Sequence, residues 1–402
     1  MNRPTLTLLG ALLFGMLLTP SSGHAQVRIG ADWLFLSRDN DSDAQLISGP
    51  NAVSSGEMDF DYESGYRLNF GVGLWEYELD ASWTELPEWS SSQGGTMTAP
   101  FVFDDTAGNA VVVPVPPGNT FAFNNAMFDA TTSMVMGAVE ANESEQLHTG
   151  AVWQLYSESR YDDFEINLGT NREQTWYRVS FGYRHVRFDE RAGLSVSGIF
   201  DALDSDDGAV FGDPTNEAND GLSNGALIGA GFINIDGAAD GYSAFDVMGG
   251  ASPDTVTVLH LGAADNRLDG GQMTFAGRLF PSDYVIVEGI LKAGLYRNKI
   301  TAAVSEVVSG SVNDDSVYAR TLRDERDKAA FVGTVGATVM VPVTEYITIR
   351  GGYEATFLTG IGLAAEQTAR VATDALGNAV FSADGDGVAI IHGGVLGLEL
   401  FW

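Results

Sequence analysis

Charged side chains recur on one of the two alternating faces of several apolar stretches in this chain. Arg178 and Arg184, for example, alternate with Tyr177, Val179 and Phe181. Ionised groups in such numbers would be prohibitively costly in a dry core, whereas a wet or salt-bridged lumen can hold them. The candidate lumen-lining residues are Arg67, Glu78, Asp80, Glu165, Arg178, Arg184, Arg278, Glu288, Lys292, Arg350 and Glu354.

Motifs for metal binding are sparse. No pair of residues stands at the His-x-x-x-His spacing of a metal site. Residues 39–43 begin like a calcium loop, but Ala44 replaces the turn glycine and Pro50 replaces the final glutamate. The acidic segment 384–386 is an equally weak candidate for a calcium site. We therefore expect no metal and no cofactor, although weak calcium binding shared among several loops stays open.

The elements that would position the lumen charges are β-strands, because side chains on a strand alternate between two faces. In the segment Phe60–Leu74, aromatic and aliphatic residues share one parity and charged or polar residues share the other. The segment 77–84 repeats this pattern after a very short connection near Trp75, which predicts a hairpin. Three further hairpins of this kind are predicted over 164–183, 273–296 and 331–357.

The connections between these segments alternate between short and long. The short ones lie near residues 75, 172, 282 and 343, and the long ones at about 39–57, 87–155, 189–265, 300–326 and 359–386. Outer-membrane barrels have such short periplasmic turns and long outer loops. With an opening strand near 27–38 and a closing strand over 387–402, the sequence predicts an all-β fold. We expect a transmembrane antiparallel up-and-down β-barrel of about ten strands, or twelve if 189–265 holds another hairpin.

Aromatic residues gather at the short-turn end of the predicted strands, among them Trp75, Trp176, Tyr346 and Trp402. Rings with one apolar and one wet side favour a membrane interface. The closing strand ends in the run 396–402, which has leucines and a tryptophan on one face. This pattern is typical of a strand whose outer face meets lipid.

Composition narrows the classes further. The chain has 402 residues, a net charge of −33 and 21 basic residues, which argues against a nucleic-acid partner. It has no cysteine, so disulfides and thiol catalysis are excluded. The apolar run Leu6–Leu18 follows Arg3 and precedes small residues up to Ala25, which predicts a signal peptide over 1–25. Residues 26–402 would then form one barrel domain.

Short motifs occur in order along nearly every predicted strand. They are Trp33-Leu34-Phe35-Leu36, Gly65-Tyr66-Arg67, Phe164-Glu165-Ile166-Asn167-Leu168, Phe181-Gly182-Tyr183-Arg184, Arg267-Leu268 through Gly270 and Gln272, Gly352-Tyr353-Glu354 through Gly360 and Gln367, and His392-Gly393-Gly394 before Gly397-Leu398. In this order they resemble a family of β-barrel porins abundant in planctomycetes, which is similar to the pore-forming major outer membrane proteins of legionellae. Glu354 departs from the family pattern, where an amide is expected. The resemblance implies a barrel in the outer membrane of a Gram-negative type of envelope.

Three functional hypotheses follow. The first is a porin for passive passage of small solutes, with selectivity set by the lumen charges. About eight strands leave an interior just filled by side chains, so ten give a narrow path that paired charges can close. The second is a non-conducting structural or adhesive barrel that presents large acidic surface loops. The third is a soluble periplasmic all-β protein.

We expect no enzyme. An outer-membrane protease would place Asp and His side chains at the barrel rim. His148 and His260 lie in predicted outer regions rich in Asp, but chance placement explains this equally well. The expected partners are outer-membrane lipid, the barrel-assembly machinery and, if the lumen conducts, small solutes. The sequence does not indicate an oligomeric state.

Overall fold

The computed structural model describes thirteen stretches of the chain. They are residues 27–40, 45–47, 53–96, 145–147, 152–171, 176–198, 200–202, 231–235, 256–282, 284–309, 317–368, 370–373 and 379–402. The predicted signal peptide over 1–25 lies outside them. Within these stretches no helix is long and apolar enough to cross a membrane.

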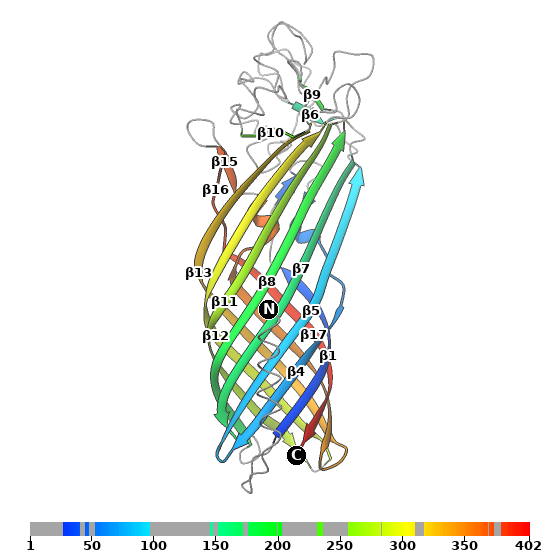
Figure 1. Ribbon diagram of the computed structural model, residues 1–402. Coiled ribbons are helices and arrows are strands. Elements are labelled where there is room, and N and C mark those ends of the chain that lie inside the picture. The colour runs from blue at the N-terminus through cyan, green and yellow to red at the C-terminus, as the bar shows by residue number, and fades with distance from the viewer. Residues whose placement is uncertain are drawn as a thin grey trace, which may run out of the picture.

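Ten long strands form one closed ring (Figure 1). They are β1 (Val27–Asn40), β4 (Glu63–Leu74), β5 (Tyr77–Thr96), β7 (Val152–Thr170), β8 (Tyr177–Gly198), β11 (Val256–Pro281), β12 (Ile286–Ser309), β13 (Val317–Pro342), β14 (Ile347–Ile361) and β17 (Gly387–Phe401). Each pairs antiparallel with its neighbours, and the pairings β13–β14 and β1–β17 close the ring. The predicted up-and-down barrel of about ten strands is confirmed.

The two ends of the ring meet at the first and last described residues. The backbone N–H of Val27 donates to the Trp402 carbonyl over 2.9 Å, and Trp402 donates back to Val27 over 3.1 Å. Hydrocarbon offers no water to unpaired backbone groups, so sheets can span a membrane only as closed barrels. The pairing leaves no open edge at this level of the wall.

The predicted short connections are all at the lower end in Figure 1. The link from β4 to β5 is only Trp75–Glu76, and the link from β13 to β14 is 343–346. Trp75 adopts a φ of 56°, in the left-handed region that non-glycine residues seldom occupy. Its ring is exposed at this end of the barrel.

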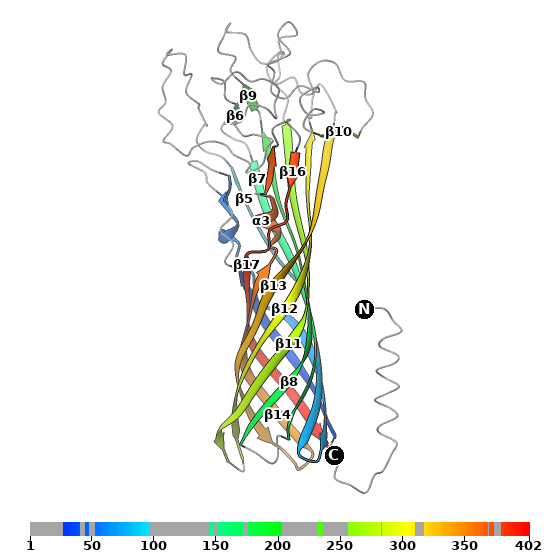
Figure 2. The ribbon, with the colours of Figure 1, turned by 90° about the vertical axis from the view of Figure 1, so that its left-hand side faces the viewer.

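Six strands are much taller than the other four, as Figures 1 and 2 show. β5, β7, β8, β11, β12 and β13 have 19 to 26 residues, against 12 to 15 in β1, β4, β14 and β17. The tall strands extend into the ranges predicted as loops at 87–155, 189–265 and 300–326, so those boundaries are wrong. In those upper parts the outward residues become polar and the inward residues become apolar, as β8 shows.

On β8 the two faces exchange polarity part-way along the strand. Over 177–183 the outward residues are Tyr, Val, Phe and Tyr, while the inward ones are Arg, Ser and, at 184, Arg. Over 185–191 the outward residues are His, Arg, Asp and Arg, while inward-facing Val186 and Phe188 are fully buried. The barrel therefore has a lower zone with an apolar outer face and an upper zone with an apolar interior.

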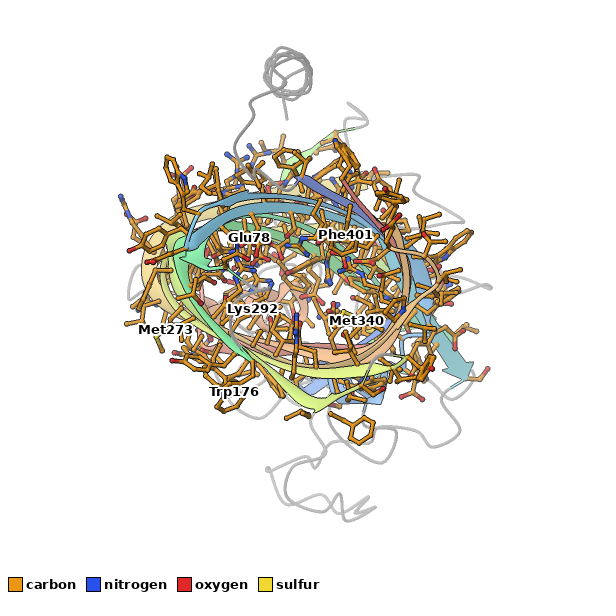
Figure 3. The ribbon with its side chains drawn as sticks, turned by 90° about the horizontal axis from the view of Figure 1, so that it is seen from below. Glu78, Trp176, Met273, Lys292, Met340 and Phe401 are labelled. Carbon is orange, nitrogen blue, oxygen red and sulfur yellow. The ribbon has the colours of Figure 1, made fainter. Side chains whose placement is uncertain are left out.

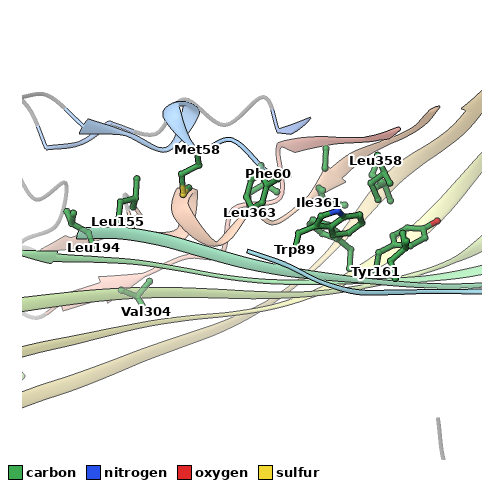
Figure 4. Packing of buried hydrophobic residues seen from close by; sticks show 14 of the residues in the cluster. Met58, Phe60, Trp89, Leu155, Tyr161, Leu194, Val304, Leu358, Ile361 and Leu363 are labelled. Carbon is green, nitrogen blue, oxygen red and sulfur yellow. The ribbon is translucent and has the colours of Figure 1, made fainter. Parts of the chain in front are cut away.

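A hydrophobic core fills the upper zone. Its members include Leu34, Leu36, Met58, Phe60, Leu86, Trp89, Leu155, Tyr161, Val186, Phe188, Leu194, Val304, Leu358, Ile361, Leu363 and Ile391. Figure 4 shows the tall strands on one side of this core and the segments carrying Phe60 and Leu363 on the other. Phe60, predicted to share the outward parity of the strand 60–74, instead lies in this core, because β4 begins only at Glu63.

Short elements accompany the upper zone. They are β2 (Gln45–Ile47), β3 (Val53–Ser54), η1 (Ser55–Glu57), β6 (Glu145–Leu147), β9 (Phe200–Ala202), β10 (Ile233–Asn234), α3 (Ala364–Thr368), β15 (Val371–Thr373) and β16 (Ala379–Phe381). β10 extends the sheet beside β13, and β6 pairs with β9. Figure 2 shows α3 among the tall strands of the upper zone.

The exchange of polarity along β8 predicts position-dependent costs for one substitution. Val179→Arg puts a charge on the outward face of the lower zone and should destabilise the barrel by about 2–4 kcal/mol. Ser195→Arg, also outward but in the upper zone, should change the stability little. Urea titration of the barrel folded in lipid vesicles measures both. Equal losses at the two positions would contradict a lipid-facing lower zone.

Candidate functional site

The lower zone encloses a polar cavity of about 140 Å³. Its charged and amide lining comprises Arg28, Asp32, Arg67, Asn69, Asp80, Glu165, Asn167, Arg178, Glu288, Lys292, Arg350 and Glu354. Seen from below in Figure 3, Lys292 and Glu78 lie inside the ring, whereas Met273 and Trp176 lie on its outside. The cavity thus gathers charges from strands far apart in the sequence.

One ionic network runs along the wall formed by β5, β4, β1, β17 and β14. Arg28 donates to Glu399 over 2.6 Å and to Glu78 over 2.8 Å. Arg350 donates two hydrogen bonds to Asp32, over 2.7 and 2.6 Å, and lies 3.6 Å from Glu399. Charge-assisted, bidentate bonds of this kind fix both partners.

Other ion pairs join strands that are not neighbours. Arg67 on β4 forms two bonds with Glu354 on β14, one of them 2.9 Å long. Lys292 on β12 bonds to Glu165 on β7, which also accepts from Gln272 over 2.7 Å. Three strand pairings separate the partners of each ion pair. Opposite charges therefore neutralise one another within the lumen.

The structure places the predicted lumen residues as follows. Eight of the eleven line the cavity, namely Arg67, Asp80, Glu165, Arg178, Glu288, Lys292, Arg350 and Glu354. Glu78 is buried against Arg28. Arg184 is buried above the cavity with Asp163, and Arg278 stands at the lower end, where its backbone N–H bonds to the Trp176 carbonyl.

Sequence reasoning missed several members of the network. Arg28 and Asp32 occupy alternate positions of β1, and this signal was present in the sequence among Val27, Ile29 and Trp33. Asn167 and Gln272 are uncharged amides that bond to each other over 2.9 Å. Their inward position follows from parity, but their contact across β8 depends on the register between strands.

A buried cluster separates the polar cavity from the hydrophobic core. Arg184 donates to Asp163 over 2.6 Å and to the Tyr161 hydroxyl over 3.0 Å. The Tyr161 ring belongs to the hydrophobic core above it. Trp89, fully buried in the same core, donates from its ring nitrogen to the Leu36 carbonyl over 2.9 Å. Polar side chains thus give way to packed apolar ones at this level.

Residues 362–368, which we call the inner segment, follow β14 and carry α3 inside the upper zone. Asn266 accepts from the Gly362 N–H over 2.7 Å and donates to the Gly362 carbonyl over 2.8 Å. Asn298 donates to the Gly360 carbonyl over 3.0 Å. A Cβ on Gly262 would lie 2.1 Å from the Ala364 carbonyl oxygen, so only glycine permits this approach. The inner segment is therefore built into the wall.

A buried ion pair supports the inner segment. Arg38 and Glu190, both almost completely buried, bond over 2.6 Å. The second carboxylate oxygen of Glu190 accepts from the Ala364 N–H over 2.7 Å. The Arg38 guanidinium also lies over the Phe60 and Phe188 rings, at 4.6 and 5.0 Å from their centroids. One charge pair thus holds two segments of the upper core.

His260 does not stand at an exposed rim. It is buried, lies 3.5 Å from Glu306 and shares that carboxylate with Arg320. Burial lowers its pKa, so the imidazole is neutral at neutral pH. His148 lies outside the described residues. The geometry does not assemble a catalytic Asp–His pair around His260, and the absence of enzymatic activity stays a prediction.

The acidic motifs serve the fold where they are described. Asp384 accepts the backbone N–H groups of Gly385 and Asp386, over 2.6 and 3.0 Å, and pairs with Arg370. Asp39 bonds to His392 over 3.0 Å. Residues 41–44 lie outside the described stretches. Among the described residues no group of three His, Asp or Glu side chains is arranged for a metal ion.

The outer wall of the lower zone is an apolar belt with aromatic residues at both ends. The exposed lower rings are Trp75, Tyr77, Trp176, Tyr177, Phe280, Tyr284, Tyr346 and Trp402; the upper ones are Trp33, Phe35, Tyr66, Tyr183, Phe331, Tyr353 and Phe357. The sequence predicted only the lower group. The Tyr66 hydroxyl donates to Glu85 over 2.6 Å, as expected where a ring meets water.

The belt has the height of a membrane. On β12 it runs from Val287 to Leu295, about 27 Å along a tilted strand at roughly 3.4 Å a residue. An outer-membrane barrel carries an apolar band about 25 Å tall between two aromatic girdles. The ring, the belt and the girdles together define an outer-membrane β-barrel.

No protein-family model matches this chain, and a search of curated proteins finds no relative. Among solved structures, it is similar to the outer membrane protease OmpT from Escherichia coli, with 10% identity, a TM-score of 0.35 and coverage of 94% of this chain and 97% of that one. A major outer membrane protein from Thermus thermophilus is 8% identical, with a TM-score of 0.23 and coverage of 94% of this chain and 100% of that one. The P. putida toluene transporter TodX is 8% identical, with a TM-score of 0.21 and coverage of 95% of this chain and 90% of that one. The assignment above therefore rests on the ring and the belt of this chain.

Breaking the buried pair under the inner segment should be costly. Arg38→Met leaves the Glu190 carboxylate buried without its partner and should lower the free energy of unfolding by about 3–5 kcal/mol. The double variant Arg38→Met/Glu190→Met should regain much of that loss, because no unpaired charge remains. Urea unfolding of the purified barrel measures both. Additive losses would show that the pair is not coupled.

The inner segment should also respond to pH. Burial, and then the nearby Asp384 and Glu190 carboxylates, raises the pKa of Glu366 to about 7 from its ordinary 4.5. The folded state retains a proton that the unfolded state releases, so the stability of this segment is highest below about pH 4.5 and falls as the pH rises through 7. Glu366→Gln should remove that fall, a gain of roughly 1–2 kcal/mol at pH 8 after solvent screening.

Hydrogen exchange of residues 362–368 measures this effect. Comparing the variant with the unmodified protein at each pH cancels the intrinsic change of exchange rate. Extra protection in Glu366→Gln should appear at pH 8 and vanish at pH 4. Glu325→Gln, which changes an exposed carboxylate on the outside of β13, is the matched control. The same gain at both pH values would contradict the raised pKa.

Proposed function

We propose that this protein is a non-conducting outer-membrane barrel whose sealed outer half supports large acidic surface loops. The observation that carries the proposal is the hydrophobic core of the upper zone, with fully buried Trp89, Phe188 and Leu363. A solute path would have to cross this core. Packed apolar interiors leave few voids larger than a water molecule.

The state of the lumen charges supports the same proposal. Arg28, Arg67, Lys292 and Arg350 are all engaged by carboxylates inside the lower zone. A conducting pore selects ions with charges that face the solute, whereas these charges face one another. A closed barrel whose strands are joined by ion pairs across the lumen is rigid enough to hold loops above the membrane.

The second candidate is regulated passage of small polar solutes, with the lumen charges setting selectivity. The polar cavity of about 140 Å³ favours it. So does the resemblance of the strand motifs to a family of porins in planctomycetes. Passage would require the inner segment and the core around it to move aside.

Planar-bilayer conductance separates the two candidates. The purified barrel should give no single-channel steps at any voltage that the bilayer withstands. Gly262→Leu tests the route directly, because its side chain would collide with the Ala364 carbonyl and displace the inner segment. Under the first candidate it too stays silent, since the rest of the core remains.

Gly351→Leu, on the outward face of β14 where a Cβ has room, is the matched control. Heat-modifiable migration on gels verifies that each variant is folded. Channel steps from the unmodified protein would overturn the proposal. Silence from that protein combined with steps from Gly262→Leu alone would establish the second candidate.

A further inference from the structure

The apolar belt contains a groove on the wall formed by β8, β11, β12 and β13. Its volume is about 480 Å³, and its walls include the exposed side chains of Phe181, Met273, Leu295 and Phe331. Gly271 lies on its floor. A Cβ there would have no atom nearer than 3.9 Å, so the missing side chain leaves open space on the outside of the barrel. The groove is as apolar as the lipid chains that surround it.

The groove lies at the upper edge of the belt. Tyr183, Gly271, Leu295 and Phe331 are directly opposite one another on successive strands. The next outward row contains Asp269, which accepts from the Tyr183 hydroxyl and lies 2.8 Å from the His185 ring nitrogen. Lipid therefore gives way to water within one row above Gly271.

The middle of the row above that one is cationic, and Asp162 on β7 and Asp327 on β13 stand at its two ends. Arg187 on β8 faces Arg267 on β11, and Arg267 faces Lys299 on β12. Like charges directly opposite one another destabilise a sheet. Arg187 pairs with Asp189, and Lys299 pairs with Glu325 over 2.9 Å. Arg267 forms no ion pair with any described residue, and Asp265 and Asp269 occupy the adjacent outward positions of β11.

The spacing of these features matches a lipid. Arg267 and Gly271 share the outward face of β11 and are four residues apart, about 13 Å along the strand. A headgroup phosphate near Arg267 would therefore place its acyl chain over Gly271. Guanidinium groups bind phosphate through paired hydrogen bonds, which favours Arg at the centre of such a site.

We propose that this wall binds one anionic phospholipid-type molecule of the outer leaflet. The acyl chain occupies the groove over Gly271, and the headgroup phosphate meets Arg267, with Arg187 and Lys299 on either side. The protein as a whole carries a net charge of −33, which repels anions. Retention of an anionic lipid here thus depends on the local row. The inference is independent of whether the lumen conducts.

Native mass spectrometry of the full-length barrel in detergent tests this site. Titration with phosphatidylglycerol should show one tightly retained lipid, bound about tenfold more tightly than phosphatidylcholine. Inorganic phosphate alone should neither bind nor compete, because it lacks the chain that fills the groove. Competition by inorganic phosphate at the same concentrations would overturn the proposal.

Two variants address the two halves of the site. Arg267→Gln should abolish the preference for phosphatidylglycerol. If Arg267→Gln does not fold, Lys299→Gln serves as the test variant in its place. Gly271→Leu fills the groove without a clash and should weaken both lipids by about tenfold.

Arg323→Gln, at an exposed arginine higher on β13, and Gly351→Leu, at an outward glycine with room for a side chain on β14, are the matched controls. Both should bind like the unmodified protein. Unchanged binding in either site variant, or equal losses in the controls, would overturn the assignment.

Discussion

The structure depends on one constraint: each residue of a strand is committed to one face, while the solvent outside that face changes from lipid to water along the strand. On β8 the outward Val179 needs lipid and the outward Arg187 needs water. Inward Arg184 and Val186 show the complementary change over a single step. The exchange of polarity thus fixes the height of the barrel in the membrane and the level at which its lumen turns from polar to dry.

The two interiors stabilise the barrel by different means. In the lower zone, charges are satisfied by opposite charges, as Arg67 is by Glu354 across three strand pairings. In the upper zone, β1, β4, β14 and β17 stop short, and the inner segment packs its apolar side chains against the remaining wall. The few charges buried there, such as Arg38 and Glu190, form ion pairs. The proposal that the barrel does not conduct depends on the second of these interiors.

Sequence reasoning predicted much of the lower zone. Period-two alternation identified all ten strands, the short turns and the inward direction of Arg178, Lys292 and Arg350. It missed the upper halves of six strands, because residues such as Arg187 and Asp189 reverse the polarity rule that was used to find them. It also missed the inner segment, since the pairing of Asn266 and Asn298 with Gly362 and Gly360 is a tertiary property. Hence the lumen charges were foreseen and the dry core above them was not.

Spin labels on β8 test the exchange of polarity most directly, because the chain has no cysteine and single sites can be labelled cleanly. In lipid vesicles, a label at residue 179 should be relaxed by oxygen dissolved in the bilayer, and one at residue 191 by a water-soluble nickel complex. A label at residue 188 should be shielded from both. Strong relaxation of the label at 188 by nickel would show an aqueous upper lumen and would contradict the account.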